Sequence, residues 1–411
     1  MQGAEHVFRE RGYEAASVSA ICRRVGVAQG TFYLYFANKE EIYVRLVEGL
    51  QNQLVARLRA AVAAASSPLA GFHSAYNVLL DCFAENAGLF QVFREAEFVR
   101  QEIPTRFYGA VCAELIGIVV AGVAAGAFRD LDPEVVAYGI LGTVLFLCLR
   151  FAVWGGSAIP QDVRQVGVDL ILHGIAADSR RIEPQKRPRP DGSWSGKSAP
   201  SSDEPEGGEA TRRALLVAAE RAFGEAGFHG TTVSTITYLA GVGQGTFYLY
   251  FPSKVAIFTE LVREISRDFR RRQTLAVAQC ADRRAAEVEG LRSFLRWVRE
   301  HPGAYRIVRE AEFVDEGVGK WYYTRLAEGY ARGLAAAMDR GEVRRCDPEA
   351  LTYALLGVAH LSGQRWALWE EAERCAEDVL PQLVALVLGG LREDRVPGED
   401  GAVHPLANGV L

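Results

Sequence analysis

Residues 17–36 read SVSAICRRVGVAQGTFYLYF, and residues 232–251 read TVSTITYLAGVGQGTFYLYF. In both stretches a hydroxyl residue that can cap a helix precedes a short helical run, and Gly26 or Gly241 separates that run from a second one. Two short helices joined by a glycine-containing turn are the outline of a helix-turn-helix. The two stretches therefore predict an all-α fold in which each presents one helix to DNA.

The two stretches belong to one long internal repeat. Residues 5–39 align without a gap onto residues 220–254, an offset of 215, with 18 of 35 positions identical. The same offset relates the motif Arg-Glu-Ala-Glu-Phe-Val at 94–99 to its copy at 309–314. An offset that persists so far along the chain predicts that a whole domain occurs twice.

Length and composition set the expected domain boundaries. The chain has 411 residues, 49% of them hydrophobic and 24% charged, which suits a folded protein with more than one core. Residues 184–208 are rich in Pro, Gly and Ser, and such a composition predicts a flexible linker. We expect a first helix-turn-helix domain at 1–46, a helical regulatory and dimerisation domain at 47–178, a linker at 179–208, a second helix-turn-helix domain at 209–261, a second regulatory domain at 262–394, and a disordered tail at 395–411.

Apolar spacing and capping residues predict long helices in both copies. Residues 39–65 repeat apolar side chains at three- and four-residue intervals. Asp132 and Asp347 each precede a proline suited to the first helical position, so helices are expected over Glu134–Trp154 and Glu349–Trp369. The longest apolar runs are shorter than the ~18 to 20 residues that cross a bilayer. We therefore expect buried helices and no membrane partner.

Charge and motif content exclude several classes of function. The net charge is −5 and no segment is strongly basic, so DNA binding has to come from a local motif. The seven cysteines are dispersed and never form a C-x-x-C pair, which suits reduced thiols in a cytoplasmic protein. No metal-ligand spacing, phosphate-binding loop or serine-nucleophile motif occurs. The expectation is a protein with no cofactor, no metal and no catalytic activity.

The second short helix of each stretch carries side chains suited to DNA. Glutamine can read a base edge, and threonine and tyrosine hydroxyls can donate to phosphate. The alternative is that the tyrosines only pack between helices. Residues 29–36 and 244–251 are identical while the neighbouring surface differs, which favours DNA contact. Lys39 and Lys254 share one repeat position in a chain with 41 arginines and 5 lysines, and an ammonium beside a helix N-terminus suits a phosphate.

Residues 26–39 and 241–254 resemble the DNA-binding signature of the TetR family of bacterial repressors. The resemblance implies two tandem units, each with a three-helix DNA-binding domain followed by helices that form a small-molecule pocket and a dimerisation surface. It implies DNA contacts by Ser17, Gln29, Thr31, Tyr33, Tyr35 and Lys39, and by Thr232, Gln244, Thr246, Tyr248, Tyr250 and Lys254. The sequence departs from the pattern at Met1, which aligns with Leu216, so Arg212 and Arg213 have no counterparts in the first copy. Two readings stay open: the start is misassigned, or the first headpiece is the weaker one.

The regulatory regions give a less specific signal. The repeated Arg-Glu-Ala-Glu-Phe motif could set a buried charge against a ligand, or it could form a solvated helix face with local Arg and Glu pairing. The second copy is also rich in aromatic residues suited to lining a pocket, Tyr305, Tyr322 and Tyr323 among them. The candidate ligand residues are Arg94, Glu97, Phe98, Arg309, Glu312, Phe313, Trp321 and Trp366.

These observations predict a ligand-responsive transcriptional repressor. Its partners would be a double-stranded DNA operator, imperfectly palindromic, and a small hydrophobic or amphipathic effector. Because one chain holds two units, it could form an intrachain pseudo-dimer, with further homo-oligomers open. The alternatives are a helical small-molecule-binding protein, or a partner-sequestering protein, that no longer binds DNA.

Overall fold

The computed structural model describes residues 1–98, 100, 102–156, 158–174, 207–369 and 374–389, and every regular element within them is a helix. The first half of the chain, residues 1–174, contains α1 (Gln2–Ala15), α2 (Val18–Val25), α3 (Gln29–Tyr33), α4 (Lys39–Ala63), α5 (Pro68–Glu85), α6 (Ala87–Ala96), α7 (Glu102–Ala124), α8 (Pro133–Leu147), the π-helix η1 (Cys148–Val153) and α9 (Gln161–His173). The second half, residues 207–389, contains α10 (Gly207–Gly230), α11 (Val233–Ala240), α12 (Gln244–Tyr250), α13 (Lys254–Val277), α14 (Arg283–Glu300), α15 (Pro302–Val314), α16 (Glu316–Asp339), α17 (Pro348–Gly363), the π-helix η2 (Gln364–Leu368) and α18 (Ala376–Gly389).

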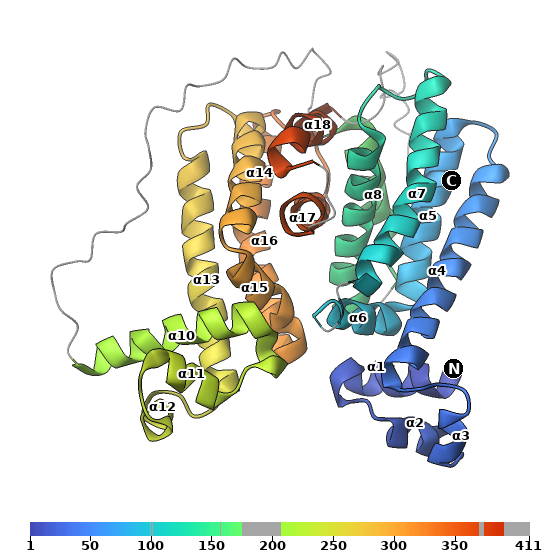
Figure 1. The fold of residues 1–411 in the computed structure, drawn as a ribbon. Helices are drawn as coiled ribbons and strands as arrows, with labels where there is room; N and C mark the ends of the chain where they lie inside the picture. The colour runs from blue at the N-terminus through green and yellow to red at the C-terminus, as the bar shows by residue number, and fades with distance from the viewer. Residues whose placement is uncertain (99, 101, 157, 175–206, 370–373, 390–411) are drawn as a thin grey trace, which may run out of the picture.

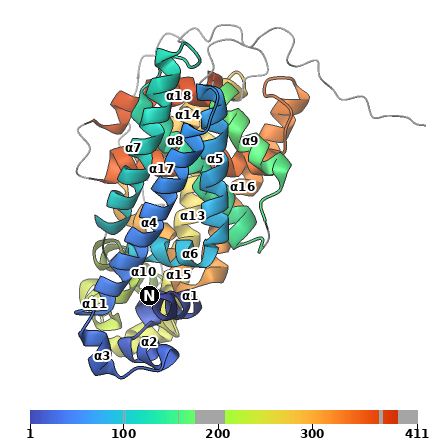
Figure 2. The ribbon, with the colours of Figure 1, turned by 90° about the vertical axis from the view of Figure 1, so that its right-hand side faces the viewer.

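The helices of the first half recur in the same order in the second half. Helices α1–α3 form the first headpiece and α10–α12 the second headpiece, and both lie at the same end of the molecule (Figure 1). The long helices α4, α5 and α7 rise from one headpiece and α13, α14 and α16 from the other, with α8 and α17 between them (Figures 1 and 2). The linker expected at 179–208 lies outside the described residues except for Gly207 and Gly208, which begin α10, and the tail expected at 395–411 lies outside them entirely.

The predicted long helices form, with one difference at their ends. Helix α4 begins after Asn38, whose side chain accepts a hydrogen bond from the Glu41 amide, and α8 begins after Asp132, which caps it in the same way. Each of the two apolar helices expected to run to a tryptophan instead ends in a π-turn, η1 or η2. A π-turn adds a residue to the helical turn and shifts the phase of the side chains that follow it.

Helices α8 and α17 cross at a pair of glycines that occupy the same repeat position. A β-carbon on Gly142 would overlap the carbonyl group of Gly357, and a β-carbon on Gly357 would overlap that of Gly142. Helices α9 and α18 pack beside this crossing and contact α17 and α8. We call the surface where α8, η1 and α9 meet α17, η2 and α18 the seam.

Ion pairs across the seam are reciprocal. Arg150 Nε lies 2.7 Å from Glu349 Oε1, and Arg365 Nη2 lies 2.9 Å from Glu134 Oε1, so the same two repeat positions pair in both directions. The aromatic contacts repeat in the same way: Trp154 packs against Tyr323 and Tyr353, and Trp369 packs against Tyr108 and Tyr138. Contacts of residue i with j and of j with i are the mark of a two-fold related interface.

Helices α7 and α8 differ in how they are buried. Among the described residues, the spans Glu102–Ala124 and Pro133–Val153 are long and apolar enough to cross a membrane by length and composition alone, each with a mean hydropathy of 2.0. The second span is 89% buried and lies at the seam, as expected for a core helix. The first span is 44% buried. Both apolar runs were expected to form buried helices, and this is fully true only of α8.

Candidate nucleic-acid interface and effector cavity

Each headpiece contains the helix-turn-helix that the sequence predicts. Ser17 Oγ accepts a hydrogen bond from the Ala20 amide (3.1 Å) at the start of α2, and Thr232 Oγ1 accepts one from the Thr235 amide (3.1 Å) at the start of α11. Helix α2 ends at Gly26 (φ 75°), and α11 ends at the equivalent glycine with φ 68°. A left-handed residue favours glycine and turns the chain directly into the second short helix.

In the first headpiece the predicted DNA-reading residues lie on the exposed face of α3 and just after it. Phe32 is buried and anchors the helix to the core, whereas Gln29, Thr31, Tyr33 and Tyr35 are exposed. Tyr33 and Tyr35 expose 56% and 69% of their surface. Large aromatic side chains so far out of a core are available to a partner.

In the second headpiece the corresponding residues are less uniformly exposed. Gln244 and Tyr248 are exposed, Tyr248 at 56%, but Thr246 and Tyr250 are half-buried. A β-carbon on Gly208, in the first turn of α10, would lie 3.5 Å from the Tyr250 hydroxyl. The beginning of α10 therefore covers part of this tyrosine.

The two matching lysines cap a helix in the structure. Lys39 Nζ donates to the carbonyls of Tyr13 (2.8 Å) and Glu14 (3.2 Å), and Lys254 Nζ donates to those of Phe228 (2.8 Å) and Thr231 (2.8 Å). Each ammonium thus neutralises the carbonyl end of the first headpiece helix. These bonds use two of the three N–H donors of each ammonium. The phosphate contact expected of both lysines would use the third donor and remains a prediction.

The candidate ligand residues of the repeated motif pair with one another between the two halves, from α6 to α15. Arg94 Nη1 lies 2.9 Å from Glu312 Oε2, and Arg309 Nη1 lies 2.6 Å from Glu97 Oε1. All four side chains are largely buried, and we call them the ion-pair cluster. Beside it the rings of Phe98 and Phe313 lie 5.7 Å apart. Each buried charge is compensated by a partner from the other half, and the ligand contact expected of these residues remains a prediction.

The second position of the same motif holds the headpieces, a role that the sequence reasoning missed. Glu95 accepts hydrogen bonds from the backbone N–H groups of Tyr13 (2.6 Å) and Glu14 (3.1 Å), and Glu310 accepts the Phe228 N–H with both oxygens at 3.0 Å. Burial raises the pKa of both carboxyl groups above their ordinary value. The repetition of the whole Arg-Glu-Ala-Glu-Phe motif was the available signal.

The two candidate tryptophans also have other roles. Trp366 is buried at the seam, where its ring lies 5.5 Å from that of Tyr138. Trp321 is half-buried, with the Arg263 guanidinium 6.0 Å from its ring. Neither lines the apolar cavity of the second half, and the ligand contact expected of both remains a prediction.

The second half contains a cavity of about 410 Å³ between α13, α14, α16 and α17. Phe269, Phe294, Tyr305, Tyr322 and Tyr323 are among its lining residues, and the three tyrosines are among the aromatics that the sequence marked as suited to a pocket. None of the eight candidate ligand residues lines it. Its volume and apolar walls suit a small organic molecule.

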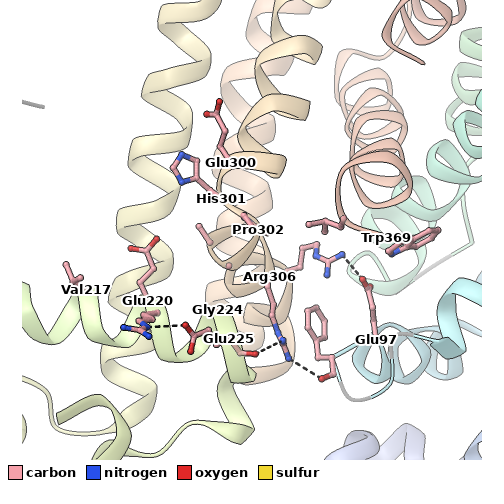
Figure 3. Close-up of a pocket in the computed structure, with 16 residues that line it drawn as sticks. Glu97, Val217, Glu220, Gly224, Glu225, Glu300, His301, Pro302, Arg306 and Trp369 are labelled. Atoms are coloured by element: carbon pink, nitrogen blue, oxygen red, sulfur yellow. Dashed lines mark hydrogen bonds and ion pairs between the residues drawn. The ribbon is translucent and has the colours of Figure 1, made fainter. Parts of the chain in front are cut away.

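A more open cleft of about 760 Å³ lies between the second headpiece and the seam (Figure 3). Arg306 crosses it, donating to the carbonyl of Glu225 in α10 (3.3 Å) and to that of Phe98 in the first half (3.4 Å). Glu97, Glu220 and further charged side chains line the rest. This charged, open cleft joins the second headpiece to the first half, and it lacks the apolar walls of an effector site.

Comparison with known proteins gives consistent matches. Residues 1–46 and 215–261 match the bacterial regulatory proteins of the tetR family. The Fatty acid metabolism regulator protein of Bacillus subtilis (strain 168) is 32% identical over 150 residues, covering 35% of this chain and 77% of that protein. The HTH-type transcriptional repressor KstR2 of Mycobacterium tuberculosis (strain ATCC 25618 / H37Rv) is 26% identical over 182 residues, covering 43% and 90%.

Among solved structures, the transcriptional regulator FadR from Bacillus subtilis in complex with stearoyl-CoA is similar, with 22% identity and a TM-score of 0.38. That match covers 41% of this chain and 94% of the other. Each of these matches takes in most of the relative and less than half of this chain.

Proposed function

Because the chain belongs to the TetR family of bacterial regulatory proteins, we propose that it is a pseudo-dimer in which two TetR-like units of one chain repress transcription together. The protein is a ligand-responsive transcriptional regulator of this family. The proposal adds that both headpieces of one chain bind one operator. It divides the chain at the expected boundaries, with DNA-binding domains at 1–46 and 209–261 and regulatory domains at 47–178 and 262–394.

The reciprocity of the seam is the observation that carries the proposal. Gly142 and Gly357 lie 215 residues apart, and the same offset maps the Arg150–Glu349 pair onto Arg365–Glu134. It also maps the two ion pairs of the ion-pair cluster onto each other. A two-fold arrangement of this kind is how two copies of one surface bind each other. Here both copies belong to a single chain, and both headpieces lie at one end of it (Figure 1).

We assign DNA contact to the residues that the family resemblance marks, with the geometry as support. They are Ser17, Gln29, Thr31, Tyr33, Tyr35 and Lys39 in the first headpiece and Thr232, Gln244, Thr246, Tyr248, Tyr250 and Lys254 in the second. Identical recognition residues read similar half-sites. The preceding helices differ, with Arg23 and Arg24 where the second copy has Tyr238 and Leu239, so the operator is an imperfect palindrome.

The effector of the proposed repressor is a small hydrophobic or amphipathic molecule in the cavity of the second half. Its apolar walls support this class, and so does the name of the Bacillus subtilis relative, which refers to fatty acid metabolism. Occupancy of the cavity would change the relative placement of the headpieces and release the operator.

Two measurements test the proposal. Light scattering of the full chain at low micromolar concentration should give a particle of one chain, 45.0 kDa, because a tethered partner has an effective concentration of order mM. An obligate two-chain particle would contradict the pseudo-dimer. A gel shift on the DNA that flanks the gene should show specific binding, and its absence would favour a binding or sequestering protein without DNA activity.

A further inference from the structure

The two halves differ in what fills the space between their long helices. Glu287 and Tyr330 line the cavity of the second half, and the same repeat positions in the first half are Phe72 and Leu115. Phe72 and Leu115 are fully buried, and the ring of Phe72 packs against that of Phe128 at 6.3 Å. Core side chains therefore occupy, in the first half, the space that is open in the second.

The cavity also carries positive charge that the first half lacks. Arg270 and Arg332 line it, and their counterparts are Val55 and Gly117. Arg270 Nε donates to the Ser266 carbonyl of its own helix (3.2 Å), and within the described part of the chain no carboxylate pairs with either guanidinium. Apolar walls with two unpaired guanidinium groups suit a molecule with an apolar body and an anionic group.

A chain of hydrogen bonds leads from this cavity to the ion-pair cluster. The Tyr305 hydroxyl, at the cavity wall, donates to His360 Nδ1 (2.6 Å). With its amide oriented to satisfy both ends, Gln364 accepts from His360 Nε2 (2.8 Å) and Arg309 Nη1 (3.1 Å) and donates to Glu97 Oε1 (3.1 Å). Burial holds the pKa of His360 well below its usual range, and the charges of Arg309 and Arg94 lower it further. The imidazole is therefore neutral, so it can accept a hydrogen bond from Tyr305 and donate one to Gln364.

No equivalent chain exists on the other side of the cluster within the described residues. The repeat positions of His360 and Gln364 are Leu145 and Leu149, which have no hydrogen-bonding side chains. The cavity of the second half is thus the one connected to Glu97, which belongs to the first half.

The cluster in turn borders both headpieces. Glu97 follows Glu95, whose carboxylate holds the first headpiece, and Arg309 precedes Glu310, whose carboxylate holds the second. A displacement of Tyr305 or His360 by a bound molecule therefore reaches the attachment points of both headpieces through a few side chains.

Building on the proposed function, we propose that the chain binds one amphipathic organic anion, in the second half only, and that Gln364 passes its occupancy to the first headpiece through Glu97. The two units of the pseudo-dimer then have different tasks. Both read DNA, and one senses the effector.

The first experiment measures the number and location of binding sites with 1-anilinonaphthalene-8-sulfonate as the probe. Isothermal titration of the full chain should give one site per chain. Arg270→Val, which installs the first-half residue, should weaken binding about tenfold through loss of a charge-assisted contact. Arg271→Val, on the same helix but outside the cavity lining, should leave the affinity unchanged. Two sites per chain, or equal affinity in both variants, would overturn the proposal.

The second experiment tests the link to the first headpiece. Footprinting on the operator with saturating probe should show loss of protection over both half-sites for the parent chain. Gln364→Leu should release only the half-site of the second headpiece, and Leu149→Met at the matching repeat position should behave like the parent. Release of both half-sites by Gln364→Leu, or full protection of the parent with probe bound, would overturn the link.

Two controls keep the outcomes distinct. Circular dichroism checks that each variant is folded, and Gln364→Met replaces Gln364→Leu if the leucine variant is not. A chain that never protects DNA without probe would refute the proposed function itself. A chain that protects DNA but binds two probe molecules would refute only the inference of a single sensing half.

Discussion

The seam and the interiors of the two halves have diverged to different degrees, although the same repeat supplies both. At the seam, Gly142 faces Gly357 and each arginine finds the same glutamate position in the other half. In the interior, Phe72 of a packed core corresponds to Glu287 of a cavity wall.

The difference follows from what each residue contacts. A seam residue contacts a residue of the other half, and the same two repeat positions also meet with the halves exchanged. A substitution at the seam therefore has to fit the surface of both halves. An interior residue contacts only its own half. One half can therefore open a cavity while the other keeps a close-packed core, and the shared surface is unaffected.

The recognition helices, like the seam, have diverged little between the two halves. Tyr33 and Tyr248 occupy the same repeat position, and both expose 56% of their surface. Replacing both with alanine should weaken specific operator binding by about 2 to 6 kcal/mol, since each lost contact costs about 1 to 3 kcal/mol. Fluorescence anisotropy with labelled operator measures the loss, and circular dichroism should show an unchanged fold. A folded double variant that binds like the parent would remove these tyrosines from the interface.

The seam itself can be broken at its glycines. Gly142→Ala should lower the free energy of unfolding by about 3 kcal/mol, because the new methyl group meets backbone of the opposite helix and cannot be relieved by a side-chain movement. Gly357→Ala should cost the same. Gly117→Ala, on α7 with nothing within 4 Å, should instead stabilise the helix by up to about 1 kcal/mol. Urea unfolding compares the three, and equal effects at positions 142 and 117 would show that the seam is not closely packed.

The two halves also differ in how deeply the glutamate that holds each headpiece is buried. Glu310 is buried and Glu95 is half-buried, so Glu310→Ala should cost about 1 to 3 kcal/mol by leaving the Phe228 N–H unpaired, and Glu95→Ala should cost less. Hydrogen exchange at the Phe228 amide should accelerate in the first variant. Glu225→Ala, an exposed change on the same headpiece, serves as the control. Equal losses for Glu95 and Glu310 would mean that burial does not distinguish the two attachments.

The interior of the sensing half should respond to pH through His360. Its folded pKa is held well below that of an unfolded histidine, about 6.5, so the unfolded chain takes up a proton that the native protein does not. Stability should therefore fall as the pH drops below about 6.5, with a slope of at most about 1.4 kcal/mol per pH unit. His360→Leu, which copies Leu145, should remove this part of the slope. Urea unfolding from pH 7.5 to 5.5 tests it, and parallel curves would show that His360 does not contribute.

The sequence predicted features that depend on neighbouring residues. The cap at Asp132, the turn at Gly26 and the apolar stripe of α4 all form as expected, because each is decided within a few residues. The family resemblance and the repeat offset added the order of the helices.

The candidate effector site was predicted less well, because it depends on tertiary contacts. Arg94 and Glu97 suggested either a ligand contact or local pairing, and the structure pairs them with residues more than 200 positions away. The cavity wall is assembled from four helices, and no local pattern links Arg270 to His360. Tyr305 was singled out only as one aromatic residue among several.

The placement of both sides of the seam in one chain has a consequence for gene dosage. A repressor assembled from separate subunits loses operator occupancy with roughly the square of its concentration once dimers dissociate, because two molecules have to meet first. In the proposed pseudo-dimer the α8–α17 contact forms within one chain, at a rate and to an extent that do not depend on concentration. Occupancy then falls only in proportion to copy number, so a cell with very few molecules keeps a working switch.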